Sequence, residues 1–161
     1  ISHSVDPAIA VLAGEDRRRV VIETARRLTA IGGDVLKVEF PYDASVSDEG
    51  RWADACAELD EASPVPWVLL SGGVDDATFE RQVEVACRAG ASGVLVGRSV
   101  WAEAARLVDP DRERFLATDA VDRLARLVAI VEADGRPWLD RLSALRDASV
   151  GADWFRTYPE G

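Results

Sequence analysis

Residues 34–41 read Asp-Val-Leu-Lys-Val-Glu-Phe-Pro (DVLKVEFP), and this short stretch decides how the rest of the chain is interpreted. Its apolar and β-branched residues are typical of a buried strand, and the proline stops the strand at a loop. Lys37 lies near the carboxyl end of this stretch. It is the only lysine of the 161-residue chain, whereas arginine is abundant. The stretch therefore predicts a strand over residues 35–40 that presents one unusual amine.

The segments on either side of this strand alternate between helical and extended patterns. Apolar residues at helical spacing predict a helix over residues 15–31, and further helices around residues 52–59 and 79–87. Continuous apolar runs predict two more strands, at residues 67–70 and 93–96. Strands that are apolar throughout and separated by helices are typical of a parallel sheet. We therefore expect an α/β fold.

The spacing of the strands matches the length of the units in βα repeats, but three strands do not close a barrel. A complete (βα)8 barrel takes about 250 residues. We expect residues 13–110 to supply the last three βα units of one barrel domain, and residues 111–161 to add a C-terminal helical cap with helices near 112–133 and 139–148. The chain contains no methionine, so we expect it to begin inside a longer product. The N-terminal half of the barrel would then come from elsewhere.

Composition excludes several classes of partner. The formal net charge of −10 disfavours nucleic acid and anionic membrane surfaces. No apolar run approaches the roughly 20 residues needed to span a bilayer, and the first residues lack a signal-peptide pattern, so we expect a cytoplasmic protein. Cys56 and Cys87 fall in helical, partly apolar segments, which predicts reduced thiols in the core.

Lys37 and Glu39 are the first candidate catalytic pair. Residues two apart on a strand face the same side, and we expect both charges to face inward. Burial would favour the neutral amine of Lys37, which can attack a ketone and form an imine. A protonated imine withdraws electrons, so an adjacent carbon–carbon bond can break. The alternative is a structural ion pair between the two side chains.

Glycine-rich turns follow the second and third predicted strands. Ser71, Gly72 and Gly73 form one turn, and Gly97 and Arg98 form the other. Glycine lets backbone N–H groups approach an anion closely, and an arginine can bind a phosphate through two hydrogen bonds. In (βα)8 enzymes the loops after the last two strands often hold a phosphate. Each turn could instead be only a turn.

Three motifs together resemble the tagatose-1,6-bisphosphate aldolase family, which includes sulfofructosephosphate aldolases. They are DVLKVEFP, WVLLSGG at residues 67–73 and AGASGVLVGRSVW at residues 89–101. The resemblance spans about residues 17–104 and implies a (βα)8 barrel and class I aldolase chemistry without metal or cofactor. It implies that Lys37 forms the Schiff base. It also implies that four residues contact the C1 phosphate of the ketose: Ser71, Gly73, Gly97 and Arg98.

The functional hypothesis is retro-aldol cleavage of a phosphorylated ketose to dihydroxyacetone phosphate and an aldehyde. A single histidine argues against a metal-dependent aldolase. Glu39 would orient Lys37 or transfer a proton, while His3 would lie near the barrel mouth or simply be solvated. The alternatives are a sugar-phosphate isomerase and a non-catalytic phosphosugar-binding module. Exposed sheet edges predict a homo-oligomer, and the sequence leaves the identity of the sugar phosphate open.

Overall fold

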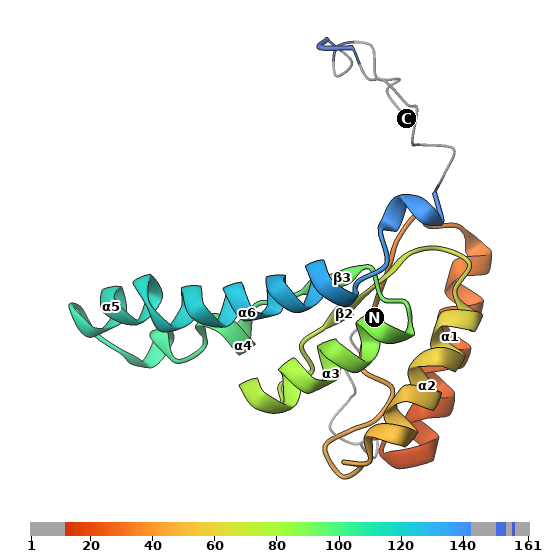
Figure 1. Cartoon of the computed structure of the whole chain (residues 1–161), viewed down its shortest axis with the longest axis horizontal. Coiled ribbons are helices and arrows are strands. Elements are labelled where there is room, and N and C mark those ends of the chain that lie inside the picture. The colour runs from red at the N-terminus through yellow and green to blue at the C-terminus, as the bar shows by residue number, and fades with distance from the viewer. Residues whose placement is uncertain (1–11, 143–150, 154–155, 157–161) are drawn as a thin grey trace.

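The computed structural model describes residues 12–142, 151–153 and 156, and its centre is a small parallel sheet (Figure 1). The strands are β1 (Leu36–Val38), β2 (Trp67–Leu70) and β3 (Gly93–Leu95), in that order. Both strand pairs are parallel. The predicted α/β class with parallel strands is therefore confirmed.

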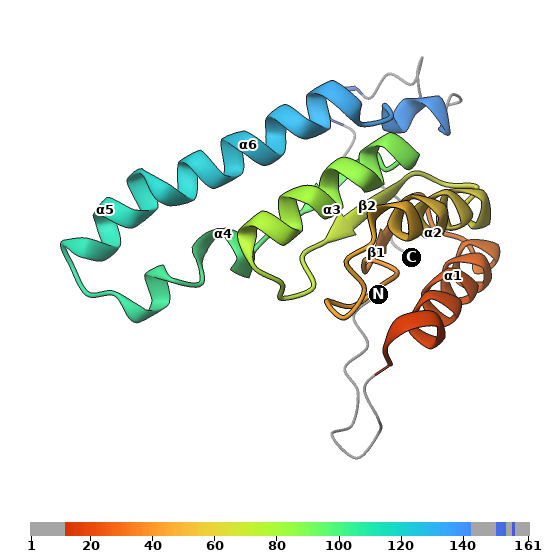
Figure 2. The same ribbon diagram turned by 60° about the horizontal axis from the view of Figure 1, so that its bottom comes forward.

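Four long helices lie side by side along one face of this sheet (Figure 2). Each helix packs on the next in chain order, so they form a single layer. None of the described helices is long and apolar enough to cross a bilayer. The four helices are α1 (Gly14–Ile31), α2 (Glu49–Ala62), α3 (Asp76–Ala89) and α6 (Asp119–Asp134).

Alternating side chains of the strands build the core beneath the helices. Leu36 and Val38 on β1, and Trp67 and Leu69 on β2, are all buried. They meet apolar side chains of the helices in one continuous cluster. Burying a side chain of this size contributes roughly 1.5–3 kcal/mol, so this side of the sheet supplies most of the stability.

The opposite face of the sheet is open in the described part of the chain. Lys37 is exposed there, Val68 and Leu70 are partly exposed, and Leu95 is 51% exposed. Parallel sheets are normally covered on both faces. The outer edges of β1 and β3 also have no strand neighbour among the described residues. Within the described residues the sheet therefore has one bare face and two free edges.

The segment after β3 departs from the prediction of a single helix over residues 112–133. Short turns of helix come first: α4 (Arg98–Trp101) and η1 (Ala104–Arg106). The next helix is divided at Thr118 into α5 (Asp111–Ala117) and α6. The Thr118 hydroxyl donates to the carbonyl of Arg114 at 2.8 Å, a local bond that competes with helix continuation.

The remaining predicted helix, residues 139–148, lies mostly outside the described residues. Its first part is the turn η2 (Trp138–Asp140). The two cysteines confirm their prediction as core thiols: Cys56 and Cys87 are free and buried. Burial raises the pKa of Cys56 to about 12 and that of Cys87 to about 11, so neither is a nucleophile at neutral pH.

Polar bonds hold the amino-terminal end of the sheet to the segment that follows α6. The Asp60 carboxylate accepts hydrogen bonds from Trp67 Nε1 at 2.8 Å, from Arg136 at 3.0 Å and from Arg141 at 2.7 Å. Gly90 passes close to this cluster with φ of 118°, and a Cβ there would lie 2.5 Å from Asp60 Oδ1. A bare backbone is therefore required at Gly90.

Candidate active site

The predicted site residues come to the carboxyl ends of the three strands. The strands are parallel, so the turns after β2 and β3 leave the sheet at the same edge. Lys37 is in register with Val68, three residues before Ser71. At about 3.3 Å per residue, the Ser71 turn begins about 10 Å beyond Lys37 along the strand direction. Lys37 and the turns therefore lie at the same end of one sheet, with Lys37 about three residues before the turns.

Lys37 lies on the open face of the sheet. The prediction of a buried amine is not met in this chain, because the side chain is exposed. Lys37 also lines a hollow of about 500 Å³ at the outer edge of β1. The hollow has two exposed apolar residues, Ile31 at the end of α1 and Val35 before β1, which are 78% and 51% exposed. Enclosure of Lys37 would require polypeptide that covers this face.

Glu39 follows the end of β1, and its carboxylate is bound by Arg17 from the first turns of α1. Arg17 Nη2 donates to Glu39 Oε2 at 2.9 Å, and Arg17 Nε donates to the carbonyl of Phe40 at 3.3 Å. The side chains of Arg17 and Glu39 are 19% and 13% exposed. Sequence reasoning missed Arg17 because nothing distinguishes it locally from the two arginines that follow it.

A second contact fastens the loop after β1 to the same helix. The Gly14 N–H donates to Asp43 Oδ1 at 3.0 Å, and this bond lowers the pKa of Asp43. Tyr42 is buried and its hydroxyl donates to Glu15 at 2.7 Å. The hydrogen bond from Tyr42 is the main reason that the pKa of Glu15 is also lowered. The carboxyl end of β1 is therefore fixed by several bonds to the start of α1.

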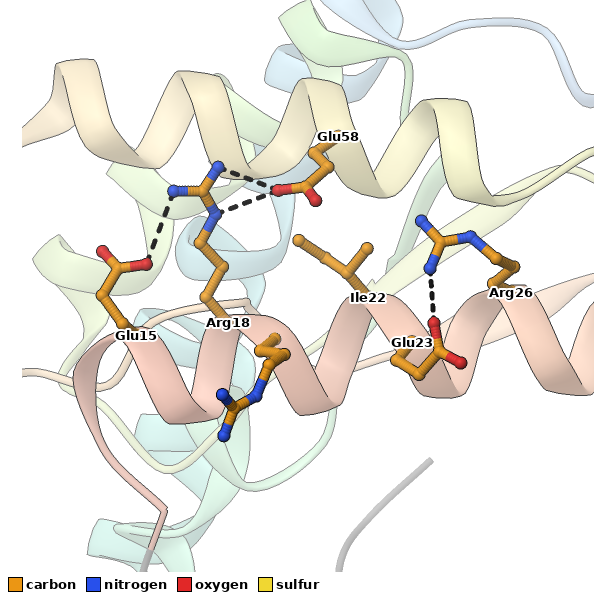
Figure 3. Close-up of a pocket in the computed structure, with 7 residues that line it drawn as sticks. Glu15, Arg18, Ile22, Glu23, Arg26 and Glu58 are labelled. Carbon is orange, nitrogen blue, oxygen red and sulfur yellow. Dashed lines mark hydrogen bonds and ion pairs between the residues drawn. The ribbon is translucent and has the colours of Figure 1, made fainter.

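A charged hollow of about 460 Å³ lies in the outer layer, between α1 and α2 (Figure 3). Arg18 crosses it and meets Glu58 at 2.8 Å and Glu15 at 3.5 Å. Arg26 is held by Glu23 on its own helix. The arginines of this hollow are thus already matched by carboxylates, and Arg18 joins the two helices, so the hollow is not a site for an anion.

The turn after β2 has room for a ligand but does not continue directly into a free helix terminus. A Cβ at Gly72 or Gly73 would meet no atom within 4 Å, and Gly73 has φ of 83°. Asp75 is the N-cap of α3, and its carboxylate accepts from the Thr78 N–H at 3.0 Å. A carboxylate of the chain therefore occupies the N-terminus of α3.

Asp75 could have been found in the sequence, because aspartate directly before a helical segment is a preferred N-cap residue. The bond from the Thr78 N–H lowers the pKa of Asp75. Asp76 behaves in the opposite way, since burial raises its pKa although Arg123 lies 2.5 Å away. Both carboxylates stand between Gly73 and the body of α3.

The turn after β3 is better suited to an anion. Gly97 is the N-cap of α4, and no side chain caps this helix. The first amides of a helix have no partner within the helix, so those of Arg98 and Ser99 are open to a ligand. The Arg98 side chain is exposed and borders a hollow of about 450 Å³. Trp101 Nε1 lies 3.6 Å from the position of a Cβ at Gly97.

Arg98 differs from most arginines of the chain in having no carboxylate partner. Among the described residues, only Arg98 and Arg106 are arginines without an ion pair. Arg123, which lines the same hollow, is bound by Asp76 and Glu103. Arg98 is therefore a cation that can accept an external anion. His3, the other residue expected near this edge, lies outside the described residues.

Comparison with known proteins agrees with this arrangement. The sequence profile of the family described as DeoC/LacD family aldolase matches residues 8–103, more than half of the chain. A protein named tagatose 1,6-diphosphate aldolase 1, from Streptococcus pyogenes serotype M1, is 30% identical over 127 residues, which cover 69% of this chain and 39% of the relative. A tagatose 1,6-diphosphate aldolase from Listeria monocytogenes serotype 4a (strain HCC23) is 28% identical over 138 residues, or 74% and 40% of the two chains.

The chain therefore spans about 40% of the length of these curated relatives. The match includes the strand with Lys37 and both glycine turns, so the resemblance noted from three short motifs extends over most of the sheet. These findings establish that the chain belongs to the DeoC/LacD aldolase family.

Proposed function

We propose that this chain carries the imine-forming lysine and the phosphate-binding turns of a class I aldolase. The reaction would be cleavage of a phosphorylated ketose, similar to tagatose or fructose 1,6-bisphosphate or to a 6-sulfo analogue, to dihydroxyacetone phosphate and an aldehyde. The enzyme would need neither metal nor cofactor. We place the activity in the cytoplasm, where buried thiols such as Cys56 and Cys87 stay reduced.

The observation that carries this proposal is the position of Lys37. The only lysine of the chain stands on the open face of a parallel sheet, below the edge at which both glycine turns emerge. In barrel enzymes this edge carries the active site. Relatives named as tagatose 1,6-diphosphate aldolases support the same chemistry.

Lys37 would act as a covalent nucleophile. Its neutral amine attacks the ketone carbon of the sugar, and loss of water gives a protonated imine. The adjacent carbon–carbon bond then breaks, and its electron pair moves into the imine to form an enamine. A base takes the proton of the hydroxyl that becomes the aldehyde. Protonation of the enamine and hydrolysis release dihydroxyacetone phosphate.

The turns would hold the phosphate of the substrate. Gly97, Arg98 and Ser99 offer backbone amides at the start of α4, and Arg98 adds an unmatched guanidinium. A short helix after the eighth strand is a frequent phosphate site in barrel enzymes. The Ser71-Gly72-Gly73 turn would contribute its hydroxyl and backbone from the neighbouring strand. Binding of the phosphate by these two turns would orient the sugar carbonyl toward Lys37.

We also propose that the rest of a (βα)8 barrel covers the open face, and that the assembled protein is a homo-oligomer. The bare face of the sheet and the free edges of β1 and β3 support a larger sheet. The greater length of the relatives supports it as well. A covered face would also desolvate Lys37, as imine chemistry requires.

A second candidate function is a non-catalytic module that binds sugar phosphates. The exposure of Lys37 favours it, because imine-forming lysines are usually enclosed in a site that excludes water. Such a module would keep the phosphate turns but would form no imine. The two candidates therefore differ in one measurable property, the covalent adduct.

Borohydride trapping tests the proposal. Protein incubated with dihydroxyacetone phosphate and sodium borohydride should gain the reduced adduct on the peptide that contains Lys37, as read by mass spectrometry. Lys37→Ala should lose the adduct and at least about a thousandfold in cleavage rate, as expected when a covalent nucleophile is removed. Lys37→Arg keeps the charge and serves as the matched control, with the same loss expected.

Native-rate cleavage by Lys37→Ala would contradict the proposal. Binding of dihydroxyacetone phosphate without any adduct in the unsubstituted protein would select the non-catalytic module instead. Isomerised product without an adduct would point to a sugar-phosphate isomerase.

A further inference from the structure

Arg17 binds both Glu39 and Phe40, in the segment that follows Lys37. It approaches from α1, a helix that begins 23 residues before Lys37 in the sequence. Its guanidinium binds the Glu39 carboxylate at 2.9 Å and the Phe40 carbonyl at 3.3 Å. Both charged side chains are largely withdrawn from solvent. An ion pair in such a place is more strongly coupled than one on the surface.

The other charged groups at this end of the strand are bound elsewhere. Asp43 is held by the Gly14 N–H, and Glu15 is held by Tyr42. The remaining groups, on α1 and α2, form ion pairs across the outer layer: Arg51 with Glu15, and Arg18 with Glu58. Of the arginines named here, Arg17 is therefore the one that binds Glu39 and Phe40, next to Lys37 in the sequence.

We infer that Arg17 is a positioning residue for Lys37: it neutralises the Glu39 carboxylate and fixes the chain at the end of β1. This inference rests on the proposed imine chemistry. Glu39 lies two residues from Lys37, so their backbones are about 7 Å apart. A nearby carboxylate favours the charged form of an amine, and a charged amine cannot attack a carbonyl. With Arg17 in place, the field of the carboxylate is largely cancelled.

The pH dependence of trapping provides the test. The rate of borohydride-trapped adduct formation with dihydroxyacetone phosphate is measured from pH 5 to 10. Arg17→Gln should move the midpoint of this profile up by roughly half a unit to one unit, because the Glu39 carboxylate then loses the guanidinium that partly neutralises it. The adduct rate at pH 7 should fall roughly three- to tenfold. Glu39→Gln should move the midpoint down, since the positive charge of Arg17 is then no longer balanced by this carboxylate.

Two further variants separate charge from structure. Arg17→Gln combined with Glu39→Gln should bring the midpoint back to the original value, which a loss of folding would not do. Arg17→Lys keeps the charge and should stay near the original profile, even though it loses the second bond to Phe40. Arg18→Gln is the matched control, since the neighbouring arginine points to Glu15 and Glu58 in the outer layer (Figure 3).

The outcomes are distinct. Absence of any adduct in the unsubstituted protein would end the imine proposal, and the role of Arg17 with it. An adduct in that protein, together with an Arg17→Gln profile that overlays that of Arg18→Gln, would overturn the role of Arg17 alone. Arg17→Gln could fail to fold. In that case a downward midpoint shift in Glu39→Gln, with no shift in Arg17→Lys, would still support the role of Arg17. No shift in Glu39→Gln would refute that role.

Discussion

The two faces of the β1-β2-β3 sheet differ more than any other two regions of the molecule. One face lies under four helices, and its strand residues Leu36, Val38, Trp67 and Leu69 are buried. The other face presents Lys37 and Leu95 to solvent. The covered face explains why the chain holds together. The open face carries the residues through which the chain would act.

If the proposed imine chemistry holds, fold and function are encoded on alternate residues of the same strands. On β1, Lys37 stands between Leu36 and Val38, and the three have the burial pattern of a strand with one dry side. Stability should therefore respond to one set of positions, and ligand chemistry to the other. Three substitution experiments test how stability, self-association and pH dependence are distributed over the molecule.

The largest effect on stability should come from the covered face. Leu69→Ala removes a fully buried side chain from β2 and should lower the free energy of unfolding by about 2–5 kcal/mol. Leu95→Ala makes the same chemical change on the open face, where the leucine is 51% exposed, and should cost less than about 1 kcal/mol. Urea denaturation measures both. Equal costs would show that the open face is covered in solution.

A smaller effect is expected on self-association. The outer side of α6 carries an apolar row, and its members Val121, Leu124 and Val128 are 54%, 44% and 45% exposed. Leu124→Lys should weaken self-association about tenfold, which corresponds to about 1.4 kcal/mol of lost apolar contact. Sedimentation velocity over a range of concentrations measures the change. Glu113→Lys, an exposed charge substitution on α5, should leave it unaltered.

The smallest effect concerns the bond that joins the loop after β1 to α1. The pKa of Asp43 is lowered in the folded state, so its contribution to stability is present above the unfolded value of about 3.8–3.9. That contribution disappears as the pH falls through the lower folded value. Asp43→Asn should cost less than about 1 kcal/mol at pH 7 and nothing at the acid end. Urea midpoints at pH 7, 5 and 3 test this, with Asp54→Asn as the exposed control.

Local signals were sufficient for most of the elements. The strand at residues 67–70 was predicted with the bounds of β2, and Gly90 ends α3 with a left-handed backbone as a C-terminal glycine does. Thr118 was the main local failure, because its hydroxyl bond to Arg114 ends α5 within a pattern that reads as one helix. The capping role of Asp75 had a local signal that went unused.

Long-range features were beyond local patterns. Arg17 and Glu39 are 22 residues apart, and only the packing of α1 against β1 selects Arg17 over its neighbours. The exposure of Lys37 could not be read from its strand either. A lysine between two buried aliphatic residues fits a closed barrel and a bare sheet equally well, and the outcome depends on polypeptide that lies opposite.

The lone lysine has a practical consequence. Lys37 provides the sole side-chain amine and lies on the bare face. The rate at which an amine-selective acylating reagent labels Lys37 therefore measures how accessible that face is. Labelling would slow when another protein segment docks there and would stop when an imine forms. The mass of a single peptide would thus report both the docking of another segment and the formation of an imine. The many guanidinium groups of the chain do not react with the reagent.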